Sequence, residues 1–173
     1  VLATPIQLAL MSARIANGGK KIKPTLLKLP RLQASNANSV MVSDKNHNII
    51  KRAMEKVSLD EFGTGRNFRL GIKGVEMAGK TGTVQVRRIS TKERESEEGV
   101  IKNEDRIWEW RDHALYVGYA PMDKPRYAIS VIVEHGGSGS SKAGPMARDI
   151  MEATLTDDPT RFIPKNPLRK PII

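Results

Sequence analysis

The chain has 173 residues, and its 29 Lys and Arg residues outnumber its 19 Asp and Glu residues, which gives a formal net charge of +10. It contains no cysteine, which excludes disulfide frameworks, cysteine-ligated zinc and thiol nucleophiles. We expect no membrane span, since no run of 18 apolar residues occurs, and no metal or other cofactor, since the three histidines lack ligand spacing.

The beginning of the chain has the pattern of an amphipathic helix. Thr4 is a candidate N-cap, Pro5 suits the first helical position, and Gln7 completes a capping box with Thr4. Apolar residues recur at helical spacing as far as Ile15. The Asn-Gly-Gly sequence at 17–19 predicts the end of this helix, because glycine accepts the left-handed conformation of a C-cap.

A second helix is expected after a polar stretch at 33–44. Ser43 or Asp44 can cap it. Its apolar stripe consists of Ile49, Ile50, Ala53, Met54 and Val57. The Gly-Thr-Gly sequence at 63–65 breaks the chain again, and further glycines interrupt it until Val75.

The second half of the chain has the pattern of β-structure. The β-branched residues over 75–86 predict one strand, and the apolar runs at 114–119 and 127–134 predict an antiparallel hairpin. A final helix follows near Pro145. The order of helices, strands and helix predicts an α+β fold, with a sheet so short that it should belong to a larger domain.

Two segments stand out by composition. Residues 87–112 mix charges of both signs, and we expect them to form an exposed excursion between strands, folded back onto the body by Trp108 and Trp110. Residues 156–173 contain four prolines and a small excess of basic residues, which predicts an extended or disordered tail. Residues 1–155 would then form the domain.

The most compact candidate site is the sequence Gly79-Lys80-Thr81-Gly82-Thr83. In a strand, Thr81 and Thr83 share one face, while Lys80 points to the other face or along the edge. Two hydroxyls beside an ammonium group can hold a carboxylate, and Gly82 leaves room for a ligand to approach the backbone. An edge strand of this kind can also pair with an extended peptide.

The residues around this site resemble one protein family. The sequence 77–86 resembles the Lys-Thr-Gly motif of penicillin-binding proteins. The segments 3–9, 16–19, 111–121 and 133–139 resemble the elements on either side of that motif. In this order they are similar to the penicillin-binding protein 2 family of elongation transpeptidases. The resemblance implies a partial penicillin-binding-protein transpeptidase or β-lactamase-like fold, in which helices flank an antiparallel sheet.

The same resemblance implies peptidoglycan D,D-transpeptidation, in which a serine acyl-enzyme cross-links stem peptides and β-lactams mimic the donor. Lys80 would be the catalytic residue of this segment, adding positive potential and binding a serine of the family's second motif. Thr81, Gly82 and Thr83 would bind the donor, with the two hydroxyls on its terminal carboxylate. The backbone N–H of Thr83 would serve the oxyanion hole, and Gln85 would contact the donor peptide.

The chain departs from the family in one respect. No serine has a Lys three positions later or an Asn two positions later, so the nucleophile motif and the second motif are both absent. We therefore expect the C-terminal part of a transpeptidase domain, inactive alone, whose serine and membrane anchor belong to other sequence of the same protein. The resemblance further implies the periplasmic face of the bacterial inner membrane and membrane proteins of the elongation machinery as partners.

Other functions are compatible with parts of this sequence. A β-lactamase or penicillin-sensor domain would use the same motif, but the upstream helix and the Glu-His-Gly-Gly sequence at 134–137 argue against it. A non-catalytic module could bind a peptide strand or nucleic acid through the positive charge. Nucleic acid is disfavoured because only 5% of the residues are aromatic and available for stacking. His113 and His135 are expected to be structural, and the loop 136–141 to lead into the last helix.

Overall fold

The structure is a computed structural model that describes residues 2–26, 42–96 and 99–157. Its strands are β1 (Ala78–Val84), β2 (His113–Ala120) and β3 (Tyr127–Val133). Its α-helices are α1 (Pro5–Ala16), α2 (Asp44–Leu59), α3 (Thr91–Glu95) and α4 (Gly144–Thr156). Short 3-10 turns η1 (Arg66–Phe68), η2 (Asn103–Asp105) and η3 (Trp108–Trp110) and a π-helical turn η4 (Gly139–Ala143) complete the elements.

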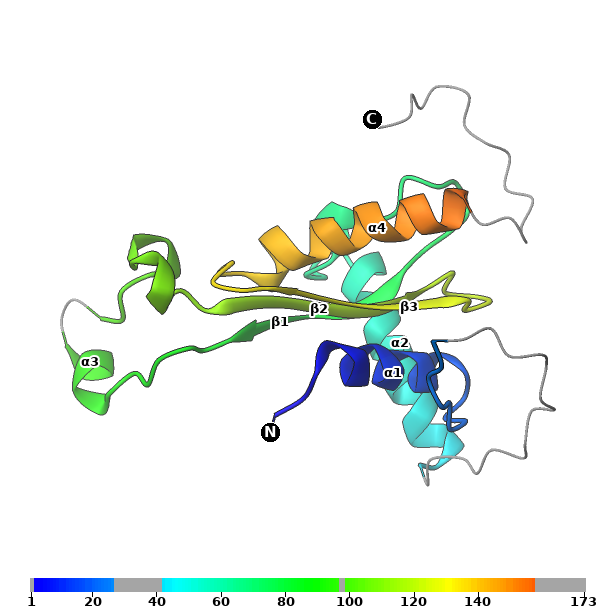
Figure 1. Cartoon of the computed structure of the whole chain (residues 1–173), viewed down its shortest axis with the longest axis horizontal. Helices are drawn as coiled ribbons and strands as arrows, with labels where there is room; N and C mark the ends of the chain where they lie inside the picture. Colours follow the sequence, from blue (N-terminus) through cyan, green and yellow to red (C-terminus); the bar gives the residue numbers. More distant parts are fainter. Residues whose placement is uncertain (1, 27–41, 97–98, 158–173) are drawn as a thin grey trace.

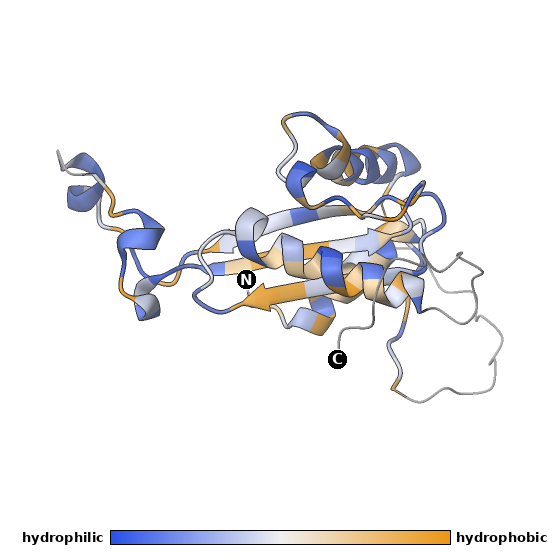
Figure 2. Ribbon diagram, turned by 90° about the horizontal axis from the view of Figure 1, so that it is seen from above, coloured by the Kyte–Doolittle hydropathy of each residue, from blue (hydrophilic) through white to orange (hydrophobic). Residues whose placement is uncertain are grey.

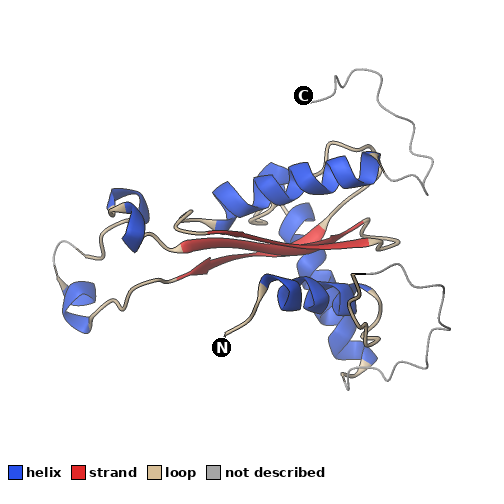
Figure 3. Ribbon diagram, in the orientation of Figure 1, coloured by secondary structure: helices blue, strands red, loops and turns tan. Residues whose placement is uncertain are grey.

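The molecule has three layers. The strands form one antiparallel sheet in the order β1-β2-β3. Helix α4 covers one face of this sheet, and α1 and α2 lie on the opposite face (Figure 1). The same arrangement of helices around the sheet is clear in Figure 3. The expected α+β fold, with helices flanking an antiparallel sheet, is therefore confirmed.

Alternation along the strands divides the core between the two faces. Ala114 and Tyr116 of β2 pack toward α4 in a buried cluster that includes Met151. Tyr119, which points the other way, packs with Met54 of α2. Apolar residues are concentrated in β3, whereas β1 and β2 mix apolar and polar residues, as the colours of the sheet in Figure 2 show. The sheet therefore holds β1 between two helical layers.

The first two helices begin as their sequences predict. The Thr4 hydroxyl accepts a hydrogen bond from the Gln7 backbone, and the Gln7 side chain accepts one from the Thr4 backbone, which completes the capping box. The Ser43 hydroxyl caps α2 by accepting from the Asn46 N–H. Both N-terminal signals are local, and both are confirmed.

The predicted apolar stripe of α2 is only partly correct. Met54 is buried, but Ile49 and Ile50 are exposed, and so is Ala53. The reason is the direction of the helix: its C-terminal half meets the sheet, where the Ser58 hydroxyl donates to the carbonyl of Met77 at 2.6 Å. The N-terminal half projects beyond the sheet, so its apolar side chains have no strand to cover them.

The described residues of the segment between β1 and β2, 87–96 and 99–112, are hereafter called the arm. It projects from the end of the sheet and carries α3, η2 and η3 (Figure 1). Most of its residues have the hydrophilic colour in Figure 2. All of its described residues except Arg106 are exposed or half-buried, and short helical turns give it internal order.

The remaining sequence predictions concern the ends of the structure. Helix α4 continues to Thr156, one residue beyond the predicted domain boundary. The predicted tail lies almost entirely outside the described residues. Among the helices of the described ranges, none combines the length and the apolar character needed to cross a bilayer.

Candidate active site

The Lys-Thr-Gly sequence lies in β1, the outer strand of the sheet. In the described part of the chain, β1 pairs with β2 and has no strand on its other side. Lys80 and Thr83 are exposed and Thr81 is half-buried. An edge strand with accessible side chains matches the sequence prediction for residues 79–83.

The register of β1 with β2 shows which way each side chain points. Thr81 lies opposite Tyr116 and Thr83 opposite Ala114, both of which face α4. Directly opposed residues share a face, so both threonines lie on the α4 side. Lys80 alternates to the side of α1 and α2, and its ammonium group donates to the carbonyl of Thr81 at 2.7 Å. The two hydroxyls and the cation therefore flank one strip of backbone.

The start of β1 is fixed by close packing. A side chain at Gly79 would overlap the hydroxyl of Tyr116, because the phenol lies directly against the glycine. Tyr116 in turn packs edge-on against Phe68, with 5.4 Å between the ring centroids. Lys80, the next residue, thus follows a backbone segment that cannot shift toward the core.

One glycine of the turn before α4 restricts the surroundings of Gly82. A Cβ at Gly139, in the turn leading into α4, would overlap the backbone oxygens of Gly82 and Leu115. The chain itself therefore approaches β1 closely on the α4 side at this point. Approach of a ligand to Gly82 from the open edge stays a prediction. Gln85 lies exposed, one residue beyond the end of β1 at Val84.

Sequence reasoning missed one residue at this strand. The hydroxyl of Thr64 lies 3.0 Å from the hydroxyl of Thr81, within hydrogen-bonding distance. The Gly-Thr-Gly sequence at 63–65 was interpretable only as a chain break, and no periodic pattern links two residues that are 17 positions apart. Only the tertiary structure brings Thr64 to the Lys-Thr-Gly strand.

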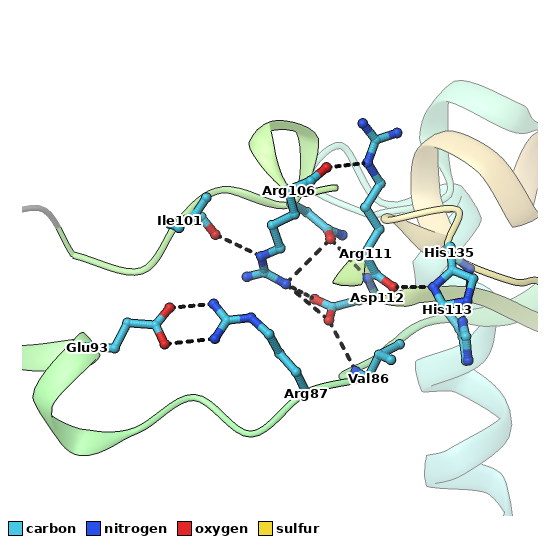
Figure 4. Close-up of polar contacts among 10 residues, drawn as sticks. Val86, Arg87, Glu93, Ile101, Arg106, Arg111, Asp112, His113 and His135 are labelled. Carbon is cyan, nitrogen blue, oxygen red and sulfur yellow. Dashed lines mark hydrogen bonds and ion pairs between the residues drawn. The ribbon is translucent and has the colours of Figure 1, made fainter. Parts of the chain in front are cut away.

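The base of the arm is held by an ion pair between buried Arg106 and half-buried Asp112, shown in Figure 4. One guanidinium nitrogen of Arg106 donates to both carboxylate oxygens of Asp112 at 3.2 Å. The Asn103 side-chain oxygen accepts from the Asp112 N–H at 2.9 Å, and Asp112 accepts from the Val86 N–H at 3.4 Å. Asp112 therefore ties both strands of the arm together just beyond β1.

His113 and His135 lie beside this junction and contact each other. His113 Nδ1 accepts from the His135 backbone N–H at 2.9 Å, and His135 Nδ1 lies 3.0 Å from the carbonyl of Arg111 (Figure 4). The His135 ring also packs on Trp108, with centroids 4.4 Å apart. These contacts favour the structural role predicted for both histidines. Trp108 thus folds back onto the body, whereas Trp110 lies near the Arg87 guanidinium within the arm.

Burial and pairing shift the pKa values of several described side chains, among them two tyrosines and Glu93. Burial raises the pKa of Tyr119 to about 12, and it raises the pKa of Tyr116 further. In the arm, the hydrogen bond from Arg87 lowers the pKa of the Glu93 carboxyl. Both tyrosines belong to β2, where they point to opposite faces of the sheet, and Glu93 lies in the arm, so these shifts concern stability rather than the chemistry of β1.

A separate hollow of about 240 Å³ lies between α1 and α2. Its lining includes Met11, Ile15 and Ile50, with His47 bonded to the carbonyl of Ile15 at 2.8 Å. It shares no lining residue with β1, and its lining contains no serine, threonine or lysine. The candidate active site is therefore the exposed edge of β1 and not this hollow.

Comparisons with known proteins agree with the geometry. The family described as penicillin binding protein transpeptidase domain matches residues 1–152. The peptidoglycan D,D-transpeptidases MrdA of Acinetobacter baumannii and Haemophilus influenzae are 34% and 33% identical to this chain. The alignments cover 96% and 88% of this chain but 24% of each relative, so the chain spans about a quarter of the length of these proteins.

Solved structures give the same result. The Pseudomonas aeruginosa PBP2 in complex with WCK 5153 has a TM-score of 0.68 and 32% identity, covering 96% of this chain and 34% of that one. The Helicobacter pylori PBP2 in complex with MreC has a TM-score of 0.63 and 28% identity, covering 88% and 25%. The chain belongs to the penicillin-binding protein transpeptidase family. The relatives named here are of the PBP2 or MrdA type, which confirms the resemblance seen in the sequence.

Proposed function

We propose that this chain is the Lys-Thr-Gly part of a peptidoglycan D,D-transpeptidase, and that it binds the donor stem peptide rather than attacking it. The observation that carries the proposal is the edge strand β1, which presents Lys80, Thr81 and Thr83 beside one accessible strip of backbone. Membership of the transpeptidase family and the similarity to MrdA proteins support it.

The proposed reaction is acyl transfer in two steps. A serine hydroxyl attacks the carbonyl of the penultimate D-alanine, and the terminal D-alanine leaves with a proton on its amine. The amine of a second stem peptide then attacks the ester, releases the serine and forms the cross-link. The covalent intermediate divides one difficult step into two. Since no Ser-x-x-Lys occurs in the 173 residues, we infer that the serine comes from other sequence of the same protein.

Each residue of the strand has a role in this proposal. The Lys80 ammonium adds positive potential and binds the serine of the second motif. The hydroxyls of Thr81 and Thr83 bind the terminal carboxylate of the donor, while Gly82 keeps the strand edge accessible and Gln85 contacts the donor peptide. The Thr83 N–H donates to the oxyanion, a contribution of about 3–4 kcal/mol in comparable sites.

β-Lactams are the expected inhibitors, because they carry a carboxylate and an acyl group in the same relation as the donor. The 28%-identical penicillin-binding protein A of Mycobacterium tuberculosis was solved as an imipenem acyl-enzyme, which supports this expectation. Relatives that are transpeptidases by name favour this function over a β-lactamase, a penicillin sensor or a non-catalytic module.

Partners and location follow from the same likeness. The Helicobacter pylori PBP2 was solved with MreC, so we propose a membrane protein of the elongation machinery as a partner here. The site would face the periplasm, and other sequence of the same protein would anchor it at the inner membrane. Residues 1–155 would form the C-terminal part of the transpeptidase domain, and residues 156–173 a tail outside it.

Labelling with a fluorescent penicillin tests the proposed function. The full-length protein should form a stoichiometric covalent adduct, whereas the isolated 173 residues should form none because they lack the nucleophile. A stable adduct on the isolated chain would refute the division of roles. A full-length protein that folds but takes no label would refute the transpeptidase function.

A further inference from the structure

A Gly-Thr-Gly turn at the end of α2 faces the Lys-Thr-Gly strand. The Gly65 N–H donates to the carbonyl of Val57 at 2.7 Å, and the Arg66 N–H donates to the carbonyl of Gly63 at 3.2 Å. A Cβ at Gly63 or Gly65 would come closer to the Val57 carbonyl than carbon and oxygen allow. The turn is thus packed against α2 so tightly that Thr64, between the glycines, has a fixed position.

The same helix is bonded to the start of β1. The Ser58 hydroxyl donates to the carbonyl of Met77 at 2.6 Å, one residue before the strand begins. Arg69 donates to the carbonyl of Ser58 at 2.6 Å and so fixes the chain that follows the turn. The turn and the strand are therefore parts of one packed unit. The packing of this unit therefore holds the backbones of Thr64 and Thr81 where their hydroxyls lie 3.0 Å apart.

The hydrogen bond between the Thr64 and Thr81 hydroxyls can run in either direction, and its direction decides whether Thr81 can also donate to a ligand. Each hydroxyl has one proton to donate and two lone pairs to accept with. If Thr81 donates to Thr64, it has no proton left for an anion. If Thr64 donates to Thr81, the Thr81 proton is free to point away from the turn, and donation into Thr81 also strengthens its own hydrogen bond.

We propose that Thr64 is a positioning residue for carboxylate recognition by Thr81, an inference that rests on the proposed function of β1. Thr64 donates to Thr81 and Thr81 donates to the carboxylate of the donor or β-lactam. Thr64 holds the Thr81 side chain in the orientation that aims its proton at the ligand. It does not touch the reacting atoms, and its effect reaches the ligand only through Thr81.

This role predicts a selective loss in the variant Thr64→Val, which keeps the shape of the side chain and removes the hydroxyl. Acylation of the full-length protein by benzylpenicillin should slow roughly fivefold, the value expected for one neutral hydrogen bond. Acylation by the methyl ester of the same penicillin should not change, because the ester has no carboxylate to bind. Thr64→Ser should behave as the wild type with both compounds.

A double-variant cycle separates this inference from the proposed function. With Thr81→Val already present, adding Thr64→Val should cause no further loss, because the effect passes through Thr81. Three results would overturn the proposed role of Thr64 without touching the carboxylate assignment of β1. They are equal slowing of Thr64→Val with benzylpenicillin and its ester, an unchanged benzylpenicillin rate in Thr64→Val, and a Thr64→Ser variant as slow as Thr64→Val. An unchanged benzylpenicillin rate in Thr81→Val would overturn the carboxylate assignment of β1 and this inference with it.

Discussion

The phenol oxygen of Tyr116 lies directly against Gly79, so that even one added carbon at Gly79 would overlap it. Gly79 also lies opposite Gly118 in the register of β1 and β2, which leaves the space between the strands to the tyrosine ring. This contact fixes the backbone immediately before Lys80. The position of the proposed catalytic lysine is therefore set by a glycine and a buried aromatic side chain.

Replacing Gly79 should disturb this arrangement. Gly79→Ala should destabilise the full-length protein by about 1–3 kcal/mol, the usual cost of overpacking a core, and it should slow penicillin acylation as β1 moves. Gly82→Ala is the matched control for stability, because its Cβ would meet only the Leu115 Cβ at 3.3 Å. Equal melting temperatures for Gly79→Ala and the wild type would contradict the packing argument.

The ion pair at the base of the arm should stabilise it. Arg106 is 8% exposed, so Arg106→Ala leaves the Asp112 carboxylate short of its main partner and should cost about 2–3 kcal/mol. Amide hydrogen exchange over 99–112 should accelerate. The exposed pair of Arg148 and Asp149 offers a control, since Arg148→Ala should change stability by less than about 0.5 kcal/mol. Similar effects of the two variants would show that the Arg106–Asp112 pair stabilises the protein no more than an ordinary surface ion pair does.

The pairing of Arg87 with Glu93 makes the arm sensitive to acid. The folded pKa of Glu93 is lowered from its ordinary value of 4.5, chiefly by the Arg87 hydrogen bond. The stabilisation is therefore complete above pH 4.5 and is lost as the pH falls through the lower, folded pKa. The fluorescence of Trp110, which lies 6.0 Å from the Arg87 guanidinium, should report the opening. Glu93→Gln should remove this acid transition. A transition that persists in the variant would show that a group other than Glu93 causes it.

Burial of Tyr119 predicts the opposite dependence at high pH. Its folded pKa is raised to about 12 from the ordinary 10, so its contribution to stability is complete below pH 10. The contribution declines as the pH rises toward 12. Tyrosinate absorbance should show a late step near pH 12 that Tyr119→Phe removes, while the still later ionisation of Tyr116 remains. A complete titration of all three tyrosines near pH 10 in the folded protein would contradict the burial.

Local features of the fold were predictable from the sequence, and distant contacts were not. The Thr4 capping box depends on residues three apart, and the alternation of Lys80 with Thr81 and Thr83 depends only on strand geometry. In contrast, the Thr64–Thr81 contact joins residues 17 apart, and the His113–His135 contact joins residues 22 apart. No periodic pattern encodes such pairs, so only the packed structure reveals them.

The exposed half of α2 illustrates the same limit. Helical spacing correctly groups Ile49, Ile50 and Met54 on an apolar stripe. Spacing does not tell where a helix leaves the sheet, and in the described structure only Met54 of these three is buried. Coverage of a stripe depends on what the rest of the domain places against it.

The rate constant for penicillin acylation of the full-length protein carrying both Thr81→Val and Thr83→Val tests the central claim most directly. Loss of both carboxylate-binding hydroxyls should lower this rate constant at least tenfold, on the order of 1.4 kcal/mol or more, while Thr91→Val in α3 should leave it unchanged. An undiminished rate constant in a correctly folded double variant would contradict the proposal that the edge of β1 holds the carboxylate of the donor.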